Sequence, residues 1–506
     1  IIIKFSILLP FHLKSFDMIT LIAGILLFLV GRTVYRLFFH PLCKFPGPKL
    51  AAASSMYEFY FSVLKGGMFI REMEKIHEKY GPIVRISPNE LHISDPDYYG
   101  ELFGGTRDKV PIAALAAFLP TSMVVTVGHN LHAARRRPVA NYFSKMAVQN
   151  LDSVLQSKID KLCSRMQEVI TTEAVFPLGA AFAALTADVI SECSYGFSVN
   201  YLDDPDFKND IQQGVSNLAS IIHIPRWVPF STTVFSSIPE GLLSRVHPAL
   251  EATFRLKGLV RTCSQAALEN KEVRRECDKT VFDALIDPSV PPVERSLNRL
   301  VDEGMIILMA GVETTASTLS LIIFNLLYTP DMLSKLRNEL DMHPGHTSWS
   351  ELERLPYMRG VINEGLRIFM SYSQRLLRSD PTENTKYKDW IIPAGTAVSQ
   401  SVHFLHTNTE IFPDPYRFDP ERWIRAQEQG DRLETCLAPF SKGTRQCLGM
   451  HLAYAEIYLG LAAIVRRFDL KIYKTTVEDM THYREYAFGH PKKRNAGLRV
   501  TVTGNR

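Results

Sequence analysis

A long apolar stretch near the middle of the chain most constrains the fold. Residues 297–328 form the longest uninterrupted helical pattern, and Thr329-Pro330 closes it. Apolar side chains cover almost the whole circumference of this helix, so it must be surrounded by other elements. With 506 residues and 46% hydrophobic content, the chain is long enough to supply them. The sequence therefore predicts a large, mainly helical body around a buried central helix.

Charge and cysteine content exclude several classes of protein. Lys+Arg 57 against Asp+Glu 53 gives a formal charge of +4, which is unlike a nucleic-acid-binding protein with a dominant basic stripe. The seven cysteines are scattered and form no CxxC pair, which argues against a disulfide framework and a structural zinc site. We expect no nucleic-acid partner and a body that lies in a reducing compartment.

Residues 18–39 are apolar apart from Arg32 and Arg36, and they are long enough for a single transmembrane helix. Basic residues follow the helix, so the positive-inside rule predicts that the rest of the chain is cytoplasmic. A cleaved signal peptide is the alternative, but no small-residue cleavage site follows. Met18 is a more natural start than Ile1, and we interpret residues 1–17 as a leader of doubtful status.

The anchor is followed by a proline-rich hinge at 40–49 and by one catalytic domain at 50–506. Alternating side chains predict two strands, at 83–87 and 90–94, near the start of this domain. Farther along, a helix is predicted over 129–144. The fold class expected is mainly α with small β regions.

A single cysteine, Cys447, directly precedes an apolar helical pattern that begins at Leu448. Gly443, Arg445 and Gly449 surround it in the sequence. The positive end of a helix dipole, free backbone N–H groups and a nearby arginine favour the thiolate, which is the form that binds metal. This arrangement indicates iron ligation by sulfur.

The middle of the long helix carries two small residues and two polar ones. Ala310 and Gly311 allow a planar group to approach, whereas Glu313 and Thr314 cost desolvation energy unless they have partners or a function. Alternatively, Thr314 bonds back to the carbonyl of Ala310 and bends the helix. Both interpretations can hold, because a local bend also makes room for a small ligand.

Two further segments predict a buried ion-pair network. Glu364 and Arg367 lie three residues apart on one helical face. Arg422 lies in a proline-punctuated segment whose order must come from tertiary contacts, and we expect it to complete a network with this pair.

Together these segments resemble the signature blocks of the cytochrome P450 haem-thiolate monooxygenases, especially the microsomal and fungal secondary-metabolite members. The blocks, in the order of that family, read Ala310-Gly311-x-Glu313-Thr314-Thr315, Glu364-x-x-Arg367, Pro420-Glu421-Arg422-Trp423 and Phe440-x-x-Gly443-x-Arg445-x-Cys447-x-Gly449. The resemblance covers essentially the whole chain from the anchor. It implies the cytochrome P450 fold and a haem b cofactor (iron protoporphyrin IX).

The resemblance also implies roles for the residues around the cysteine. Cys447 is the expected iron ligand, and Phe440 packs beside its sulfur. Gly443 and Gly449 let the backbone approach the sulfur and the macrocycle, while Arg445 meets a haem propionate.

On the opposite side of the haem, the resemblance implies that Gly311 faces the macrocycle and that Glu313 and Thr314 form a proton-delivery pair. Glu313 would link Thr314 to solvent, and both would lie beside the site of dioxygen.

Three more propionate partners follow from the resemblance. His132 stands where many members have a tryptophan, and Arg136 follows it by one helical turn. Of Arg375 and Arg378, either could be the third partner, and we expect Arg378.

The expected activity is insertion of one oxygen atom into a hydrophobic small molecule, such as a terpenoid or polyketide intermediate, at the endoplasmic reticulum membrane. Electrons would come from NADPH through NADPH-cytochrome P450 reductase, with cytochrome b5 as a second possible donor. Arg135, Arg137 and Lys442 are candidate docking charges. The alternatives are a haem-thiolate isomerase or dehydratase and a non-catalytic haem sensor; the intact Glu313-Thr314 pair argues against both.

Substrate contacts are predicted only by region. The apolar regions expected to line the substrate site are 112–123, 222–243, the helix face of Met305, Ile306 and Met309, residues 371–374 and residues 486–488.

Overall fold

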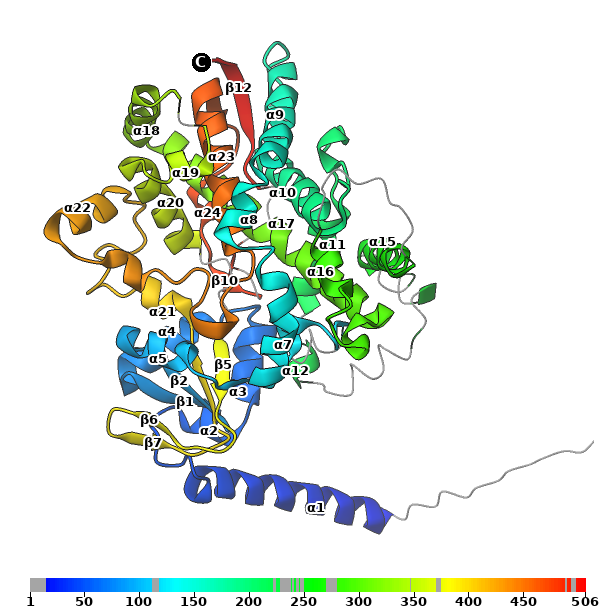
Figure 1. The fold of residues 1–506 in the computed structure, drawn as a ribbon. Helices are drawn as coiled ribbons and strands as arrows, with labels where there is room; N and C mark the ends of the chain where they lie inside the picture. The colour runs from blue at the N-terminus through cyan, green and yellow to red at the C-terminus, as the bar shows by residue number, and fades with distance from the viewer. Residues whose placement is uncertain are drawn as a thin grey trace, which may run out of the picture.

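The long apolar segment forms helix α17 (Leu297–Tyr328) over the predicted residues, and it runs through the centre of the body (Figure 1). Helices that pack against it include α10 (Leu178–Tyr195), α11 (Asp210–Ile221), α15 (Glu251–Leu268), α20 (Pro356–Phe369) and α23 (Met450–Arg467). Together they form the largest hydrophobic core of the molecule. The prediction of a buried central helix is therefore confirmed.

The computed structural model describes residues 15–111, 118–221, 224–227, 238, 241–242, 245, 250–269, 280–345, 347–369, 375–486, 489–492 and 497–506. The remaining helices of more than five residues are α1 (Ser15–Val34), α4 (Phe69–Tyr80), α5 (Pro96–Gly104), α7 (His129–Ala140), α9 (Asp152–Glu168), α16 (Val281–Ile286), α18 (Pro330–Met342) and α22 (Glu421–Gln429). The helix predicted over 129–144 is α7, which ends at Ala140.

Shorter helical segments connect these elements. They are α2 (Lys49–Ala53), α3 (Met56–Phe59), α8 (Lys145–Gln149), α12 (Ile224–Trp227), α19 (Trp349–Leu352), α21 (Val402–His406), α24 (Val477–Met480), the π-helical turns η1 (Tyr35–Phe39) and η2 (Tyr60–Leu64), and the 3₁₀ turns η3 (Met123–Val125), η4 (Tyr201–Asp203), η6 (Pro292–Arg295), η7 (Leu433–Cys436) and η8 (Gly443–Arg445).

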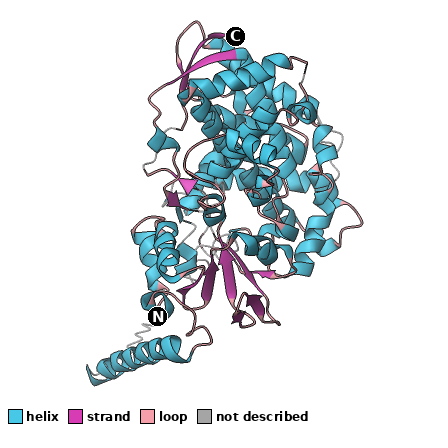
Figure 2. Ribbon diagram, turned by 90° about the vertical axis from the view of Figure 1, so that its left-hand side faces the viewer, coloured by secondary structure: helices cyan, strands magenta, loops and turns pink. Residues whose placement is uncertain are grey.

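Most strands lie at the end of the body that is closer to α1 (Figure 2). The largest sheet has the order β1-β2-β8-β5-β3, formed by Ile83–Ser87, Glu90–Ile93, Ala397–Gln400, Leu376–Ser379 and Asp108–Lys109. Strands β1 and β2 pair antiparallel, as their alternating sequence predicted. Strand β3 pairs with β5 and brings Lys109 opposite Arg378.

Three smaller sheets complete the described structure. One has the order β4-β12-β9 (Val175–Phe176, Val500–Asn505 and Phe468–Ile472), and the other two are the pairs β6-β7 (Thr385–Tyr387 with Trp390–Ile392) and β10-β11 (Arg484–Glu485 with Gly489–His490). The fold is mainly α with small β regions, as expected.

The predicted ion-pair network lies between α20 and the start of α22. The Glu364 carboxylate accepts hydrogen bonds from Arg367 at 2.8 and 2.9 Å and from Arg422 Nε at 3.1 Å. Trp423 Nε1 and the backbone N–H of Asp419 also donate to it, at 3.1 and 3.0 Å. Because all polar atoms of the buried carboxylate have partners, the network holds the segment before the cysteine loop on the helical core.

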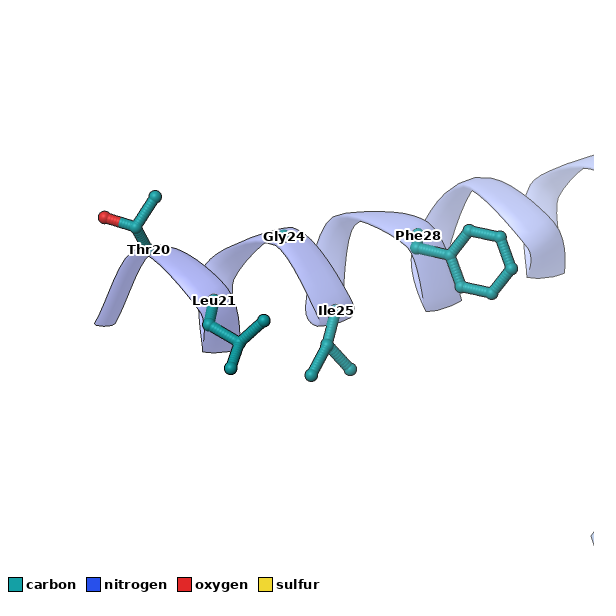
Figure 3. A pocket seen from close by; sticks show the side chains of 5 residues that line it. All are labelled: Thr20, Leu21, Gly24, Ile25 and Phe28. Atoms are coloured by element: carbon teal, nitrogen blue, oxygen red, sulfur yellow. The ribbon is translucent and has the colours of Figure 1, made fainter. Parts of the chain in front are cut away.

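Helix α1 lies apart from the body (Figure 1), and its apolar side chains are exposed. Figure 3 shows Thr20, Leu21, Gly24, Ile25 and Phe28, which line a shallow hollow on its surface. Within the described residues, Thr20–Phe39 and Leu297–Tyr328 are long and apolar enough to cross a membrane, and the second is the core helix α17. The first is therefore the candidate membrane anchor.

Candidate functional site

The cysteine lies in a closed loop just before α23. The backbone N–H of Cys447 donates to the carbonyl of Phe440 at 2.9 Å, and that of Gln446 donates to Gly443 at 3.1 Å. Helix α23 begins at Met450, with Gly449 as its N-cap. The cysteine therefore lies at a helix N-terminus, as the sequence predicted.

The two glycines of the loop have different surroundings. Gly443 has φ +76°, and a Cβ there would lie 1.9 Å from the carbonyl oxygen of Phe103 in α5. Gly449 has φ −84°, and a Cβ there would meet no atom within 4 Å. Gly443 is thus required by the contact with α5, whereas no contact within the described protein requires Gly449 to be glycine.

The Cys447 side chain is accessible, but protein atoms surround it closely enough for burial to raise the pKa of its thiol. The backbone N–H of Gly449 and the guanidinium of Arg136 act in the opposite direction and are the smaller effects. A backbone N–H group at the helix end and an arginine therefore favour the thiolate, as the sequence indicated, but without a bound metal burial outweighs them. A metal ion bound to this accessible thiol would stabilise the thiolate.

One face of α17 is also accessible within the core. Ile306, Ala310 and Thr314 follow one another by single helical turns; Ala310 is exposed, and the other two are half-buried. Met305 and Met309 are only 2% and 6% exposed and belong to the hydrophobic core. Of the three residues expected to line a substrate site from α17, Ile306 therefore shares the accessible face and the two methionines do not.

Gly311 contacts a neighbouring helix instead. A Cβ at Gly311 would lie 2.8 Å from Cγ1 of Ile190 in α10. One turn earlier on α10, Thr186 Oγ1 donates to the carbonyl of Val312 at 3.1 Å. The small size of Gly311 therefore lets α10 and α17 approach closely, and Ala310 carries the accessible surface.

Glu313 and Thr314 have defined partners. Thr314 Oγ1 donates to the carbonyl of Ala310 at 3.1 Å, which is the back-bonding the sequence suggested. Glu313 Oε2 accepts from Gln212 Nε2 at 3.0 Å, and its Oε1 accepts from Ser317 Oγ at 2.9 Å. Burial raises the pKa of Glu313, and the two hydrogen bonds oppose that rise.

A group of basic side chains gathers near the cysteine loop. Burial, Arg378 and Arg445 lower the pKa of Lys109 to about 7. Burial, followed by Arg445 and Arg136, lowers the pKa of His132 to about 3, so this imidazole is neutral. Arg136 Nη1 donates to the carbonyl of Gln446 at 2.8 Å, next to Cys447.

Only some of the N–H groups of Arg445 have hydrogen-bond partners in the described protein. Its Nη1 and Nη2 donate to the carbonyls of Thr126 and Val127 at 2.6 and 2.5 Å. Its buried Nε has no hydrogen-bond partner among the described residues. Asp108 raises the pKa of Arg445, but burial is the larger effect and lowers it.

Arg375 and Arg378 have different environments. Arg375 binds Glu58 and Glu90, each at 2.5 Å, so its charge is already balanced. Arg378 is 4% exposed, lies over the ring of Phe103 and donates to the carbonyl of Leu377 at 2.9 Å. Arg378, unlike Arg375, belongs to the basic group.

The basic group, formed by Lys109, His132, Arg136, Arg378 and Arg445, fits an anionic ligand. Desolvated cations that lower one another's pKa values are stabilised by carboxylates. A haem carries two propionates on an apolar ring. The iron at the centre of that ring can be bound by a thiolate. The charge of Arg136 lowers the pKa of both His132 and Cys447, so the basic group and the thiol are neighbours. Fold and site together define a haem-thiolate protein.

Comparisons with known proteins agree with this class. The family model of cytochrome P450 matches residues 54–496. Conidiogenone synthase PchP450 of Penicillium rubens is 47% identical over 489 residues, covering 96% of this chain and 99% of its own. The monooxygenase TRI4 of Fusarium sporotrichioides is 40% identical, covering 92% and 91%, and astB of Aspergillus terreus is 38% identical, covering 94% and 95%.

The chain belongs to the cytochrome P450 family and is a cytochrome P450 monooxygenase with haem as its cofactor. Its similar relatives are fungal enzymes, as the resemblance indicated.

One expected docking charge is not available. Arg135 donates to both carboxylate oxygens of Glu294, at 2.8 and 3.1 Å, and to Thr126 Oγ1 at 2.8 Å. Arg137 is exposed, whereas Lys442 is half-buried and donates to the carbonyl of Thr435 at 2.5 Å. Because Glu294 already pairs with Arg135, the exposed Arg137 is the better candidate for a docking charge.

Two site residues escaped the sequence analysis. Lys109 enters the basic group because β3 pairs with β5, and a two-residue strand leaves no periodic signal. Gln212 reaches Glu313 from α11, and a glutamine on an amphipathic helix carries no motif. Both depend on contacts between segments far apart in the sequence.

Several predicted substrate regions lie outside the described residues. These are residues 112–117, most of 222–243, all of 371–374, and 487–488; residues 1–14 of the expected leader also lie outside.

Replacing Gly443 by alanine should prevent the cysteine loop from packing on α5. Gly443→Ala places a Cβ on a residue with a left-handed backbone conformation and brings it against the carbonyl of Phe103. We therefore expect the unfolding free energy to fall by about 3 kcal/mol or more. Gly430→Ala is the matched control, because Gly430 has φ +79° and open space around it. It should lose only about 1 kcal/mol. Denaturant unfolding measures both, and equal losses would contradict the role of the clash.

Proposed function

We propose that this enzyme inserts one oxygen atom from O₂ into a hydrophobic terpenoid or polyketide intermediate, with electrons from NADPH delivered through a flavoprotein reductase. The observation that carries the proposal is the Glu313-Thr314 pair on a partly accessible stretch of α17. Bound haem supplies oxygen activation, and an acid-alcohol pair supplies protons to that reaction. The relative at 47% identity is named a conidiogenone synthase, which is consistent with a metabolite-producing role.

In this proposal, the cysteine loop holds the iron. Cys447 is the thiolate ligand, and Phe440, whose ring lies 5.1 Å from that of Tyr454, packs beside the loop. Gly443 fixes the loop on α5, and the open space at Gly449 leaves room for the macrocycle.

The propionates would bind the basic group. Arg445 offers its unpartnered Nε, and Arg136, His132 and Arg378 lie around it. We add Lys109 to the four residues expected from the sequence, because it is desolvated by the same surroundings and paired in register with Arg378.

Thr314 and Glu313 would deliver protons, and the raised pKa of Glu313 suits a group that acts as a proton donor. Gly311 supports this face of α17 through its contact with α10. A haem-thiolate isomerase or dehydratase would not need this pair, which favours the monooxygenase.

Electrons would come from NADPH-cytochrome P450 reductase, with cytochrome b5 as a possible second donor. An acidic docking surface on the partner would suit the exposed Arg137 and, more weakly, Lys442.

We further propose a single-pass anchor at 18–39, a hinge at 40–49 and a catalytic domain at 50–506 in the cytoplasm, at the endoplasmic reticulum membrane. The exposed apolar surface of α1 and the basic residues after it support this arrangement. Protease added to sealed microsomes should digest the catalytic domain. Full protection of that domain would contradict the orientation.

The reduced carbon monoxide complex tests the proposed function. We expect the red-shifted Soret band of a thiolate-bound haem, because sulfur donates electron density to the iron. Cys447→Ser should abolish the band, whereas Cys436→Ser, the matched control in η7, should keep it. A band that survives in Cys447→Ser would refute the ligand.

Haem retention should depend on pH through Lys109. Without haem, the pKa of Lys109 is about 7. Propionates favour the charged amine and raise this pKa, so haem binding takes up a proton between pH 7 and the raised value. Affinity should therefore fall as pH rises above 7, by up to about tenfold per pH unit. His132, with a pKa of about 3, would contribute only at lower pH.

Transfer of haem to apomyoglobin at several pH values measures this retention. Lys109→Met should bind haem more weakly and with a flatter pH dependence, while Lys471→Met, an exposed control, should behave like the wild type. Identical slopes in wild type and Lys109→Met would remove Lys109 from the propionate site.

A further inference from the structure

The carboxylate of Glu313 receives its two hydrogen bonds from neutral side chains on two different helices. Gln212 Nε2, on α11, lies 3.0 Å from Oε2, and Ser317 Oγ, one turn along α17, lies 2.9 Å from Oε1. Each carboxyl oxygen therefore has its own donor, and the two donors differ in chemistry.

The position of Gln212 is fixed by the start of its helix. Asn209 caps α11: its Oδ1 accepts from the backbone N–H groups of Ile211 and Gln212 at 2.9 and 3.0 Å. The Asn209 side chain also donates to the carbonyl of Ala183 in α10 at 2.9 Å. Asn209 is buried, so this cap ties the first turn of α11 to the helix that packs against α17.

The second connection runs from α10 to α17. Thr186 Oγ1 donates to the carbonyl of Val312, the residue before Glu313, at 3.1 Å. Gly311 packs against Ile190 on the same helix. The amide of Gln212 and the carboxyl of Glu313 are thus held by a common frame, and their contact is set by packing between helices.

The two donors distinguish the two carboxyl oxygens. The N–H₂ group of Gln212 can only donate, so Oε2 must act as an acceptor. The Ser317 hydroxyl can donate to Oε1 or accept from it. When Glu313 is protonated, Oε1 is the oxygen that can carry the proton and share it with Ser317. When Glu313 is ionised, both donors stabilise the carboxylate.

We infer that Gln212 is a positioning residue for proton delivery, which reserves Oε2 of Glu313 as an acceptor and directs the transferable proton to Oε1. This inference rests on the proposed function. In each transfer, the bond between Oε1 and hydrogen breaks, the proton leaves for the next acceptor, and Glu313 becomes a carboxylate. The Ser317 hydroxyl then gives its proton to Oε1 and takes one from a hydronium ion of the solvent, which leaves water and restores both groups.

Removing the Gln212 amide should make Glu313 a poorer proton donor. Without the donor at Oε2 the carboxylate is less stable, so Glu313 holds its proton more tightly. A hydrogen bond to a charged group has an effect large enough for a fall of about tenfold in the rate of proton delivery. A merely structural role for Gln212 would not produce a change specific to proton transfer.

The experiment compares Gln212→Leu with Gln213→Leu, because Gln213 is the exposed neighbour on the same helix. The first readout is the infrared band of the protonated Glu313 carboxyl, seen on photolysis of the carbon monoxide complex and assigned by its loss in Glu313→Gln. The second is NADPH consumption by the full chain in membranes with purified reductase and no added substrate, measured in H₂O and D₂O.

In Gln212→Leu we expect a shifted carboxyl band, NADPH consumption about tenfold slower and a larger solvent isotope effect, with a normal red-shifted Soret band. Gln213→Leu should match the wild type in all of these. If both variants match the wild type while the Soret band is normal, the inference fails and the proposed function stands. A wild type without that band would instead remove the proposed function itself.

A third result would also overturn the inference. If Gln212→Leu keeps the wild-type carboxyl band and isotope effect but changes the spectral response to added hydrophobic ligands such as lauric acid, Gln212 lines the substrate site and does not position Glu313.

Discussion

The close packing of α10 on α17 is the contact on which the site depends. A side chain larger than hydrogen at position 311 would meet Ile190, and Thr186 bonds to the backbone of α17 beside Glu313. This contact sets the rotation of α17 about its axis, so that Met305 and Met309 are buried in the core while Ala310 keeps accessible surface. A helix that is apolar all round has no preferred buried face of its own, and its neighbours decide which residues remain accessible.

The second organising element is the basic group near Cys447. Lys109 and His132 are desolvated beside three arginines, and their pKa values fall accordingly. Among the other buried arginines, Arg367 binds Glu364 and Arg375 binds Glu58 and Glu90, whereas Arg85 donates to the carbonyls of Arg36 and Pro88. Because buried cations without a counter-charge are costly, the carboxylates of a bound haem would stabilise the basic group near Cys447.

Sequence reasoning succeeded where the information is local. The extent of α17, strands β1 and β2, the position of Cys447 before α23 and the bond from Thr314 to Ala310 all follow from side chains within a few residues. The network of Glu364, Arg367 and Arg422 was also predicted, because the proline-punctuated segment that carries Arg422 needs tertiary contacts for its order. It did not reveal the desolvation of the Cys447 thiol or the partner Glu294 of Arg135, because both come from distant segments.

By itself, the sequence determined the central helix, the cysteine loop, the apolar N-terminal segment and the family, because each is written in contiguous residues or in short motifs of fixed order. Only the tertiary structure decided that Arg375 pairs with two carboxylates, that Arg378 and Lys109 lie together in the basic group, and that Gln212 donates to Glu313. These contacts join residues that are far apart in the chain, and a side chain's charge balance, burial and hydrogen-bond partners exist only after those segments have packed together.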